Sequence, residues 1–314
     1  MKITLDPSKI LAGQMIYRHM EPFLQKHQTK NIMDFFSGSG EMTKILYQNY
    51  PMFINDHMYH CCLITESQII YYPEVKRRIE ILNQVLPIEG LLTRRYASGE
   101  KGVLPSSIAM KMDGMRIQIE EWYQQYFISR NQYVKLLGIF LYCVDYYLNN
   151  VYTITHSIDD EIPDFKIQNL FDLDEKPNKY YIISNEEGLK VNFDKFYDTI
   201  RFTTDHLFPE VKVESIYLNL VHQRSKFSFI LETLARYDDS QIKDEIFNKN
   251  RMKELAKKFE NVPLLFIRYN GGLKDMKIAR VFEDLGRKVE LIKIDLGKKR
   301  NQKSVIEEFL LVVE

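Results

Sequence analysis

The sequence predicts an α/β protein, built as a doubly wound, mostly parallel sheet with an antiparallel C-terminal strand and a helical insertion. Short apolar runs with strand character alternate with helical runs in residues 1–72 and again in residues 176–314, an order typical of parallel sheets covered by helices. Residues 73–175 carry two long helical patterns instead, so we assign them to an insertion. The last two strand-like runs are joined by "GKKRNQKSVI", which is too short for a crossover helix and predicts an antiparallel pair.

The N-terminal elements follow from the spacing of apolar residues. A helix is expected over residues 9–26, where apolar side chains recur at helical intervals. The stretch "KNIMDFFSGSGEMTKILYQNY" then predicts a short strand, a glycine-rich turn and a helix. The next stretch, "PMFINDHMYH", predicts a strand that ends at Asp56, and a helix follows it through Cys62 to Ile70.

The remaining elements alternate once the insertion has ended. The insertion is expected to hold helices around residues 109–126 and 131–148, followed by an acidic, proline-containing loop, "DDEIPDFKIQNLFDLDEKPNKYY". Strands are then predicted at "KYYIIS", "VESIYLNL", "VPLLFIRYN", "KVELIKIDL" and "EEFLLVVE". Helices are expected between them, at residues 229–237, 242–258 and 274–285.

Composition excludes several classes of protein. With 314 residues, 45% of them apolar, the chain can bury a large core, and its 43 basic and 43 acidic residues give no support for a strongly polyanion-binding surface. The three cysteines, Cys61, Cys62 and Cys143, predict a reducing compartment rather than a disulfide framework, and no Cys/His spacing indicates zinc. No window approaches a membrane span or a signal-peptide core, so we expect a soluble, cytoplasmic chain without a metal.

A glycine turn and an acidic neighbour indicate a nucleoside-type ligand. Asp34 ends the first predicted strand, and Gly38 and Gly40 lie in the turn before the next helix, where glycine lets backbone N–H groups approach a ligand. Asp56 ends the following strand, where an acidic side chain reaches a ribose diol in sheets of this type. The first glycine of the dinucleotide fingerprint is missing, which disfavours NAD and fits S-adenosylmethionine. The alternative interpretation is a tight strand–helix turn with no ligand.

Several motifs, in the right order, resemble the adenine-specific DNA methyltransferases of bacterial restriction–modification systems, which carry a D-P-P-Y tetrapeptide. The matching stretches are "DFFSGSGEMTKIL", "INDHMYHCCLITESQI", "MKMDGMRIQIEEW", "FTTDHLF", "FILETLARYDDSQI" and "FIRYNGGLKDMKIARVFEDLGRKVEL". The resemblance implies a Rossmann-like methyltransferase fold, S-adenosylmethionine as cofactor, DNA as substrate and target recognition by the helical insertion. The cofactor-binding residues that it implies are Asp34, Phe36, Gly38, Gly40, Asp56 and Asp205.

The catalytic tetrapeptide of that family is altered in this chain. In the family, the first residue of "DPPY" accepts a hydrogen bond from the amino group of a flipped adenine, the prolines hold a carbonyl as second acceptor, and the aromatic ring stacks on the base. Here "IYLNLVH" places Asn219, Leu220, Val221 and His222 at these positions. Asn219 can still accept a hydrogen bond, but the fixed φ of the prolines is lost. The candidate catalytic residues of this degenerate motif are Asn219, Leu220 and His222.

Other chemically distinctive residues have simpler interpretations. We predict that His57 and His60 are ordinary helix-start residues and that Cys61 and Cys62 are a buried pair of small apolar side chains. An aromatic stripe is expected to form a helix–helix core, with a base-stacking surface as the alternative; it comprises Tyr123, Tyr126, Phe127, Tyr133, Phe140, Tyr142, Tyr146 and Tyr147. The candidate phosphate contacts, each of which is otherwise a solvated charge, are Arg94, Arg95, Lys298, Lys299 and Arg300.

Three functional hypotheses follow. The first is a methyltransferase-family pseudoenzyme that forms a heterodimer with an active homologous methyltransferase subunit and aids DNA binding or recognition. The second is an active DNA adenine methyltransferase in which Asn219 and the Leu220 carbonyl hold the target amine, a view favoured by the intact cofactor turn. The third is a protein that binds S-adenosylmethionine as a ligand without any nucleic acid.

Overall fold

The computed structural model of the chain describes most of it. Described are residues 7–56, 58–97, 103–152, 164–168, 180–184, 213–220, 227–238, 249–270, 278–294 and 308–314, without the side chains of residues 7–9, 180–184 and 249–251. The chain forms two compact units. The α/β unit comprises Asp6–His57, Asn178–Gln223 and Lys243–Glu314, and the helical unit comprises Met1–Leu5, Met58–Pro177 and Arg224–Ile242.

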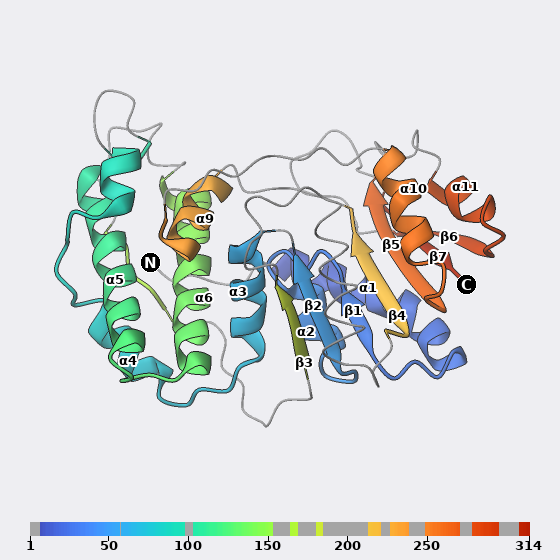
Figure 1. Ribbon diagram of the computed structural model, residues 1–314, viewed down its shortest axis with the longest axis horizontal. Coiled ribbons are helices and arrows are strands. Elements are labelled where there is room, and N and C mark those ends of the chain that lie inside the picture. Colours follow the sequence, from blue (N-terminus) through green and yellow to red (C-terminus); the bar gives the residue numbers. More distant parts are fainter. Residues whose placement is uncertain are drawn as a thin grey trace. The chain divides into compact units, whose positions relative to one another are not determined.

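A seven-stranded sheet forms the centre of the α/β unit among the described residues (Figure 1). Its strands are β1 (Ile32–Asp34), β2 (Met52–Asp56), β3 (Tyr180–Ser184), β4 (Ser215–Asn219), β5 (Leu264–Asn270), β6 (Val289–Ile294) and β7 (Glu308–Val313). The order is β3-β2-β1-β4-β5-β7-β6; the first five strands are parallel, and β7 pairs antiparallel with both β5 and β6. The predicted fold class, including the antiparallel C-terminal pair, is confirmed.

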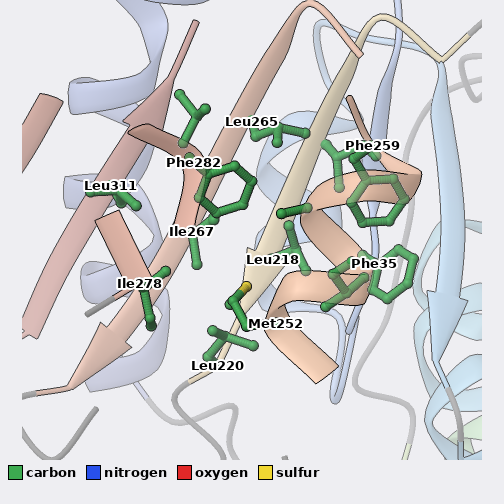
Figure 2. Close-up of a cluster of buried hydrophobic side chains, with 14 of the residues drawn as sticks. Phe35, Leu218, Leu220, Met252, Phe259, Leu265, Ile267, Ile278, Phe282 and Leu311 are labelled. Atoms are coloured by element: carbon green, nitrogen blue, oxygen red, sulfur yellow. The ribbon is translucent and has the colours of Figure 1, made fainter. Parts of the chain in front are cut away.

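Alternation along β5 gives the sheet two apolar faces. Leu265 and Ile267 belong to a buried cluster that also receives residues of α10 (Lys249–Lys258) and α11 (Ile278–Glu283) (Figure 2). Phe266 points to the opposite face, because successive side chains of a strand alternate, and its ring meets that of Phe23 edge-on at 6.4 Å. Phe23 belongs to α1 (Pro7–Lys26), the N-terminal helix expected over residues 9–26. The sheet is therefore covered on both sides, as a doubly wound fold requires.

The helical unit contains the long helices that the sequence predicts. Its helices are α3 (Tyr59–Ile69), α4 (Val75–Leu82), α5 (Ser106–Gln124), α6 (Arg130–Tyr147) and α9 (Ser228–Arg236), with π-helical turns η1 (Thr93–Ala97) and η2 (Leu148–Tyr152). Helix α6 begins with a capping box, in which the Ser129 hydroxyl accepts from the N–H of Gln132 and the Gln132 side chain accepts from the N–H of Ser129. Helix α9 follows β4 in the chain and packs on α3 and α6.

Two sequence expectations extend beyond the described residues. Helices α10 and α11 agree with the predicted helices at 242–258 and 274–285, whose first residues, 242–248 and 274–277, lie outside the described part. Of the predicted acidic loop, residues 164–168 are described and form neither helix nor strand, and its last two residues, Tyr180 and Tyr181, are the first residues of β3. The assignment of residues 1–72 and 176–314 to a methyltransferase-like domain and of residues 73–175 to a target-recognition insertion stays a prediction.

Close packing of α3 against α6 depends on a glycine. A Cβ atom at Gly138 of α6 would overlap the carbonyl oxygen of Leu63 and the side chain of Ser67, both on α3. We expect Gly138→Ala to destabilise the helical unit by about 1–3 kcal/mol, because the two helices must separate to admit a methyl group. The fluorescence of Trp122, the single tryptophan of the chain, reports urea unfolding of this unit from a buried position in α5.

The matched control for Gly138→Ala is Asn131→Ala, which adds no bulk to the exposed first turn of the same helix. We expect its urea midpoint to stay close to that of the wild-type chain, since Asn131 is exposed and is neither of the two capping-box residues, and such exposed substitutions change stability by only about 0.5 kcal/mol. Equal midpoints for the two variants would show that the α3–α6 contact tolerates a methyl group.

Candidate active site

Three adjacent strands end at the same edge of the sheet. Strand β1 lies between β2 and β4 and is parallel to both, with Asp34 opposite Ile54 on one side and Tyr217 on the other. The carboxyl ends of these strands therefore point in one direction, which is where ligands bind in open α/β sheets. Asp34, Asp56 and Asn219 are the last residues of the three strands.

The glycine turn after β1 adopts the backbone conformation that its sequence predicts. Gly38 and Gly40 have φ angles of 55° and 80°, in the left-handed region that favours glycine. The N–H of Gly40 donates to the Ser37 carbonyl at 2.8 Å, and Gly40 itself precedes the six-residue helix α2 (Glu41–Leu46). A Cβ atom built at Gly38 meets no atom within 4 Å, so the described residues leave open space beside this turn.

Hydrogen bonds join the end of β2 to the turn. The carboxylate of Asp56 accepts from the N–H of Gly38 at 2.9 Å, and the carbonyl of Asn55 accepts from the N–H of Ser37 at 3.0 Å. The Asn55 amide in turn donates to the Phe35 carbonyl at 2.8 Å. The N–H of Gly38, which the sequence predicts as a ligand contact, thus has a partner within the protein, and Asp56 braces the turn.

Asp34 is the most unusual acidic group of this edge. Its side chain is 1% exposed, its Oδ2 accepts from the Thr43 hydroxyl at 2.6 Å, and its Oδ1 is buried without a hydrogen-bond partner among the described residues. Burial raises the pKa of Asp34 to about 7, and the charges of Asp56 and Glu41 add to this effect against the Thr43 bond. A buried oxygen without a donor, on a carboxyl group that titrates near neutrality, is typical of a ligand site.

Phe36, which the resemblance assigns to cofactor binding, has its side chain in the core. It is 5% exposed, and its ring meets that of Phe35 edge-on at 4.8 Å. Both rings belong to the buried cluster on the α10–α11 face of the sheet, where the ring of Phe259 lies 5.1 Å from that of Phe35. A cofactor role for Phe36 stays a prediction.

The altered tetrapeptide begins at the end of β4. Asn219 is the last residue of the strand and is partly exposed, whereas Leu220 is 7% exposed and belongs to the same buried cluster as Met252, beside which Figure 2 shows it. The N–H of Leu220 donates to the Arg268 carbonyl at 2.8 Å, so the β4–β5 pairing continues one residue past the assigned strand. His222 lies outside the described residues.

The other predicted site residues belong to the helical unit or lie outside the described residues. Arg94 and Arg95 belong to η1 of the helical unit; Arg94 is exposed, and the guanidinium of Arg95 lies 5.5 Å from the centre of the Tyr96 ring. Asp205, Lys298, Lys299 and Arg300 lie outside the described residues. The predicted roles of all of them stay predictions.

The aromatic stripe has both buried and exposed members, and its alternative interpretation as a base-stacking surface stays a prediction. Phe140 and Tyr147 are buried in α6, as a helix–helix core requires. Tyr126 and Phe127, at the connection between α5 and α6, are 93% and 62% exposed, so the expectation of a core is wrong for them.

Sequence reasoning missed two residues that organise the candidate site. Thr43 fixes one oxygen of Asp34, and Asn55 fixes the backbone between β1 and the turn. The position of Asn55 directly before the acidic end of β2 was a usable signal, because both residues leave the strand at the ligand edge. Thr43 carried no such signal, since a threonine in a short helix has many other roles.

The described part of the chain contains neither a candidate metal site nor a membrane-spanning helix. Its residues include no group of three or more His, Cys, Asp or Glu side chains that could hold a metal ion. Of the helices that the structure describes, none has the length and apolarity to cross a membrane.

Two curated proteins are similar to this chain, while no protein-family model matches it. The chain is 24% identical to the modification methylase LlaI of Lactococcus lactis subsp. lactis over 243 residues, which are 71% of this chain and 37% of the relative. It is 29% identical to the type II methyltransferase M.NlaIII of Neisseria lactamica over 119 residues, 36% of each protein. The chain thus spans little more than a third of the length of these relatives. One relative is thus named as a modification methylase and the other as a type II methyltransferase.

Proposed function

We propose that this chain is an S-adenosylmethionine-binding subunit of a DNA adenine methyltransferase, which depends on an active homologous partner for methyl transfer and contributes to DNA recognition. The similarity to a modification methylase and a type II methyltransferase supports a role in methyl transfer. The unpartnered oxygen of Asp34 carries the cofactor part of the proposal. The proposed specificity for adenine rests on the resemblance of the motifs to those of adenine-specific methyltransferases. The proposed dependence on a partner rests on the altered tetrapeptide.

The residues at the strand edge fit this cofactor. The buried Oδ1 of Asp34 needs a donor, and an ammonium group of the methionine moiety is the donor that best suits a carboxylate. No described atom lies within 4 Å of a Cβ position at Gly38, so a ligand atom could approach this turn, and Asp56, at the end of the next strand, would accept from the ribose hydroxyls. When bound, S-adenosylmethionine supplies the activated methyl group.

Packing at Leu220 supports dependence on a partner. The resembled tetrapeptide has a proline at this position, which presents a rigid carbonyl to the target base. Here the Leu220 side chain is part of the core, and its N–H is bonded to β5. Without prolines, nothing in the covalent structure fixes the backbone after Asn219, whereas catalysis requires reacting groups to be held in a near-attack geometry.

An active enzyme is the second candidate, favoured by Asn219. This residue is partly exposed at the end of β4, the strand next to β1, so its amide oxygen could accept from the amino group of a flipped adenine. In that case the chain alone would transfer methyl groups. Asn219→Ala would then lower the rate by roughly 100- to 1000-fold, because a positioned acceptor is lost.

Calorimetric titration with S-adenosylmethionine, followed by a tritiated-methyl transfer assay on mixed-sequence duplex DNA, tests both candidates. We expect cofactor binding, no transfer by the chain alone, and transfer in the presence of the methyltransferase that co-purifies with it. Transfer by the isolated chain that is abolished by Asn219→Ala but not by Asn131→Ala would establish the active enzyme instead. Binding of the cofactor without measurable DNA affinity would point to the third hypothesis. Absence of cofactor binding would overturn all three.

A further inference from the structure

A histidine, a cysteine and a glutamate meet at the start of α3, inside the helical unit. His60 and Glu232 are buried, at 5% and 2% exposure, whereas Cys61 is partly exposed. The sequence prediction of a buried Cys61–Cys62 pair is therefore wrong for Cys61, and correct for Cys62, which is 1% exposed. His60 is also more than a helix-start residue, because it links α3 to α9 through Glu232.

Glu232 fixes the orientation of the His60 ring. Its Oε2 lies 2.7 Å from Nδ1 of His60 and also accepts from the His60 N–H at 3.1 Å. Its Oε1 accepts from the N–H of Tyr59 at 3.1 Å and from Nε of Arg236 at 3.0 Å. Burial raises the pKa of Glu232, but the hydrogen bonds from His60, together with the charge of Arg236, outweigh this effect and lower the pKa to about 2.

The ionised carboxylate determines which ring nitrogen can act as a base. A carboxylate only accepts hydrogen bonds, so Nδ1 of His60 must carry a proton and donate it to Glu232. In the neutral ring the other nitrogen, Nε2, is then an acceptor. This Nε2 lies 3.5 Å from Sγ of Cys61, within hydrogen-bond reach for sulfur.

We propose that Cys61 is a nucleophilic thiol that forms mixed disulfides with low-molecular-weight disulfides. The order carboxylate, imidazole, thiol is the arrangement that activates nucleophiles in enzymes, with a base beside the nucleophile and a third group orienting the base. The proposal is independent of methyl transfer, because all three residues belong to the helical unit.

The exchange is balanced within these groups and the disulfide. Sγ of Cys61 passes its proton to Nε2 of His60 and attacks one sulfur of the disulfide, so that a new S–S bond forms as the old one breaks. The leaving thiolate then takes the proton from Nε2 and departs as a thiol. Cys61 is oxidised to the mixed disulfide, and half of the small disulfide is reduced.

The two other thiols of the chain serve as internal controls. Cys62, the next residue in α3, and Cys143, in α6, are 1% and 0% exposed. Burial raises the pKa of Cys143 to about 12, which leaves almost no thiolate at neutral pH. A reagent that reaches the folded chain should therefore label Cys61 and leave both others unmodified.

The test measures second-order rates of modification at pH 7 with oxidised glutathione and with dithiobis(nitrobenzoate), and maps the site by peptide mass spectrometry. We expect Cys61 in the folded chain to react roughly 10-fold or more faster than the same thiol in the chain unfolded by denaturant, since a general base contributes at least this much. A folded rate equal to or below the unfolded rate would overturn the proposal without any variant.

Two variants assign the effect to the histidine and its partner. His60→Gln keeps a donor for Glu232 but has no basic nitrogen, and Glu232→Gln keeps the shape but loses the charge. We expect His60→Gln to slow Cys61 by roughly 10- to 100-fold and Glu232→Gln to slow it less, with Trp122 fluorescence verifying the fold. An unchanged rate of Cys61 modification in a folded His60→Gln variant would contradict the proposal.

Discussion

Replacing Asp34 by asparagine is expected to stabilise the α/β unit above pH 7 and to weaken cofactor binding at the same time. The folded-state pKa of Asp34, about 7, lies above its ordinary value of 3.8. Between these two values the folded chain keeps a proton that the unfolded chain releases. The free energy of unfolding therefore falls as the pH rises through this window, and the loss is complete above pH 7. Asparagine is neutral throughout and removes this loss.

The size of the effect follows from the same two pKa values. Their difference corresponds to roughly 4 kcal/mol at alkaline pH. Asparagine places an N–H₂ group where Oδ1 lacks a partner, and an unsatisfied buried donor costs about 1–3 kcal/mol. We therefore expect the free energy of unfolding of Asp34→Asn to exceed that of the wild type by about 1–3 kcal/mol at pH 8 and by little or nothing near pH 4. The difference between the two should grow as the pH rises from 4 to 7. Urea titrations at a series of pH values measure this difference.

Cofactor affinity provides the second readout for Asp34→Asn. Loss of the carboxylate should weaken S-adenosylmethionine binding by roughly 10- to 100-fold, because a hydrogen bond to a charged group is lost. Thr43→Val is the matched control: it removes the donor to Oδ2 and keeps the carboxyl group that faces the ligand. Tight cofactor binding by Asp34→Asn would place the cofactor elsewhere, whereas a stability difference that does not change with pH would contradict the raised pKa.

The local sequence patterns were sufficient to predict which residues lie at the carboxyl ends of the parallel strands. Asp34 and Asp56 each follow a short apolar run, and parallel strands bring their carboxyl ends together, so these positions follow from sequence and topology. The buried role of Leu220 was also accessible, since Leu218 and Leu220 share one face of β4 at a spacing of two residues and Asn219 faces the other way. The family resemblance drew attention to a catalytic position at Leu220 instead.

Contacts between distant residues were beyond sequence reasoning. Glu232 orients His60 from 172 positions further along the chain, and neither residue lies in a pattern that indicates the other. The position of α9 beside α3 and α6 is of the same kind, because α9 follows β4 in sequence, and its apolar face suits packing on a sheet or on helices equally well. The exposure of Cys61 depends on these contacts and could not be predicted either.

Asp113 is expected to be among the most sensitive positions of the helical unit. Its carboxylate, which is fully buried in α5, accepts five hydrogen bonds. The donors are the N–H groups of Gly90, Leu92 and Thr93, at 3.1, 3.0 and 2.8 Å, the Thr93 hydroxyl at 2.7 Å and the Tyr237 hydroxyl at 2.8 Å. This one side chain thereby joins α5, the start of the η1 segment and the end of α9.

We expect Asp113→Ala to lower the free energy of unfolding of the helical unit by about 3–5 kcal/mol or more, because it leaves several buried donors without an acceptor. Tyr237→Phe is the control, since it removes one of the five donors, leaves the other four bonds of Asp113 in place and otherwise loses only the long 3.4 Å bond from the Leu91 N–H. Its expected cost is about 1 kcal/mol. Urea unfolding followed by Trp122 fluorescence measures both. Similar losses for the two variants would mean that water or rearranged backbone satisfies the orphaned N–H groups. A much larger loss for Asp113→Ala would show that this carboxylate, within the "MKMDGMRIQIEEW" stretch, holds the helical unit together.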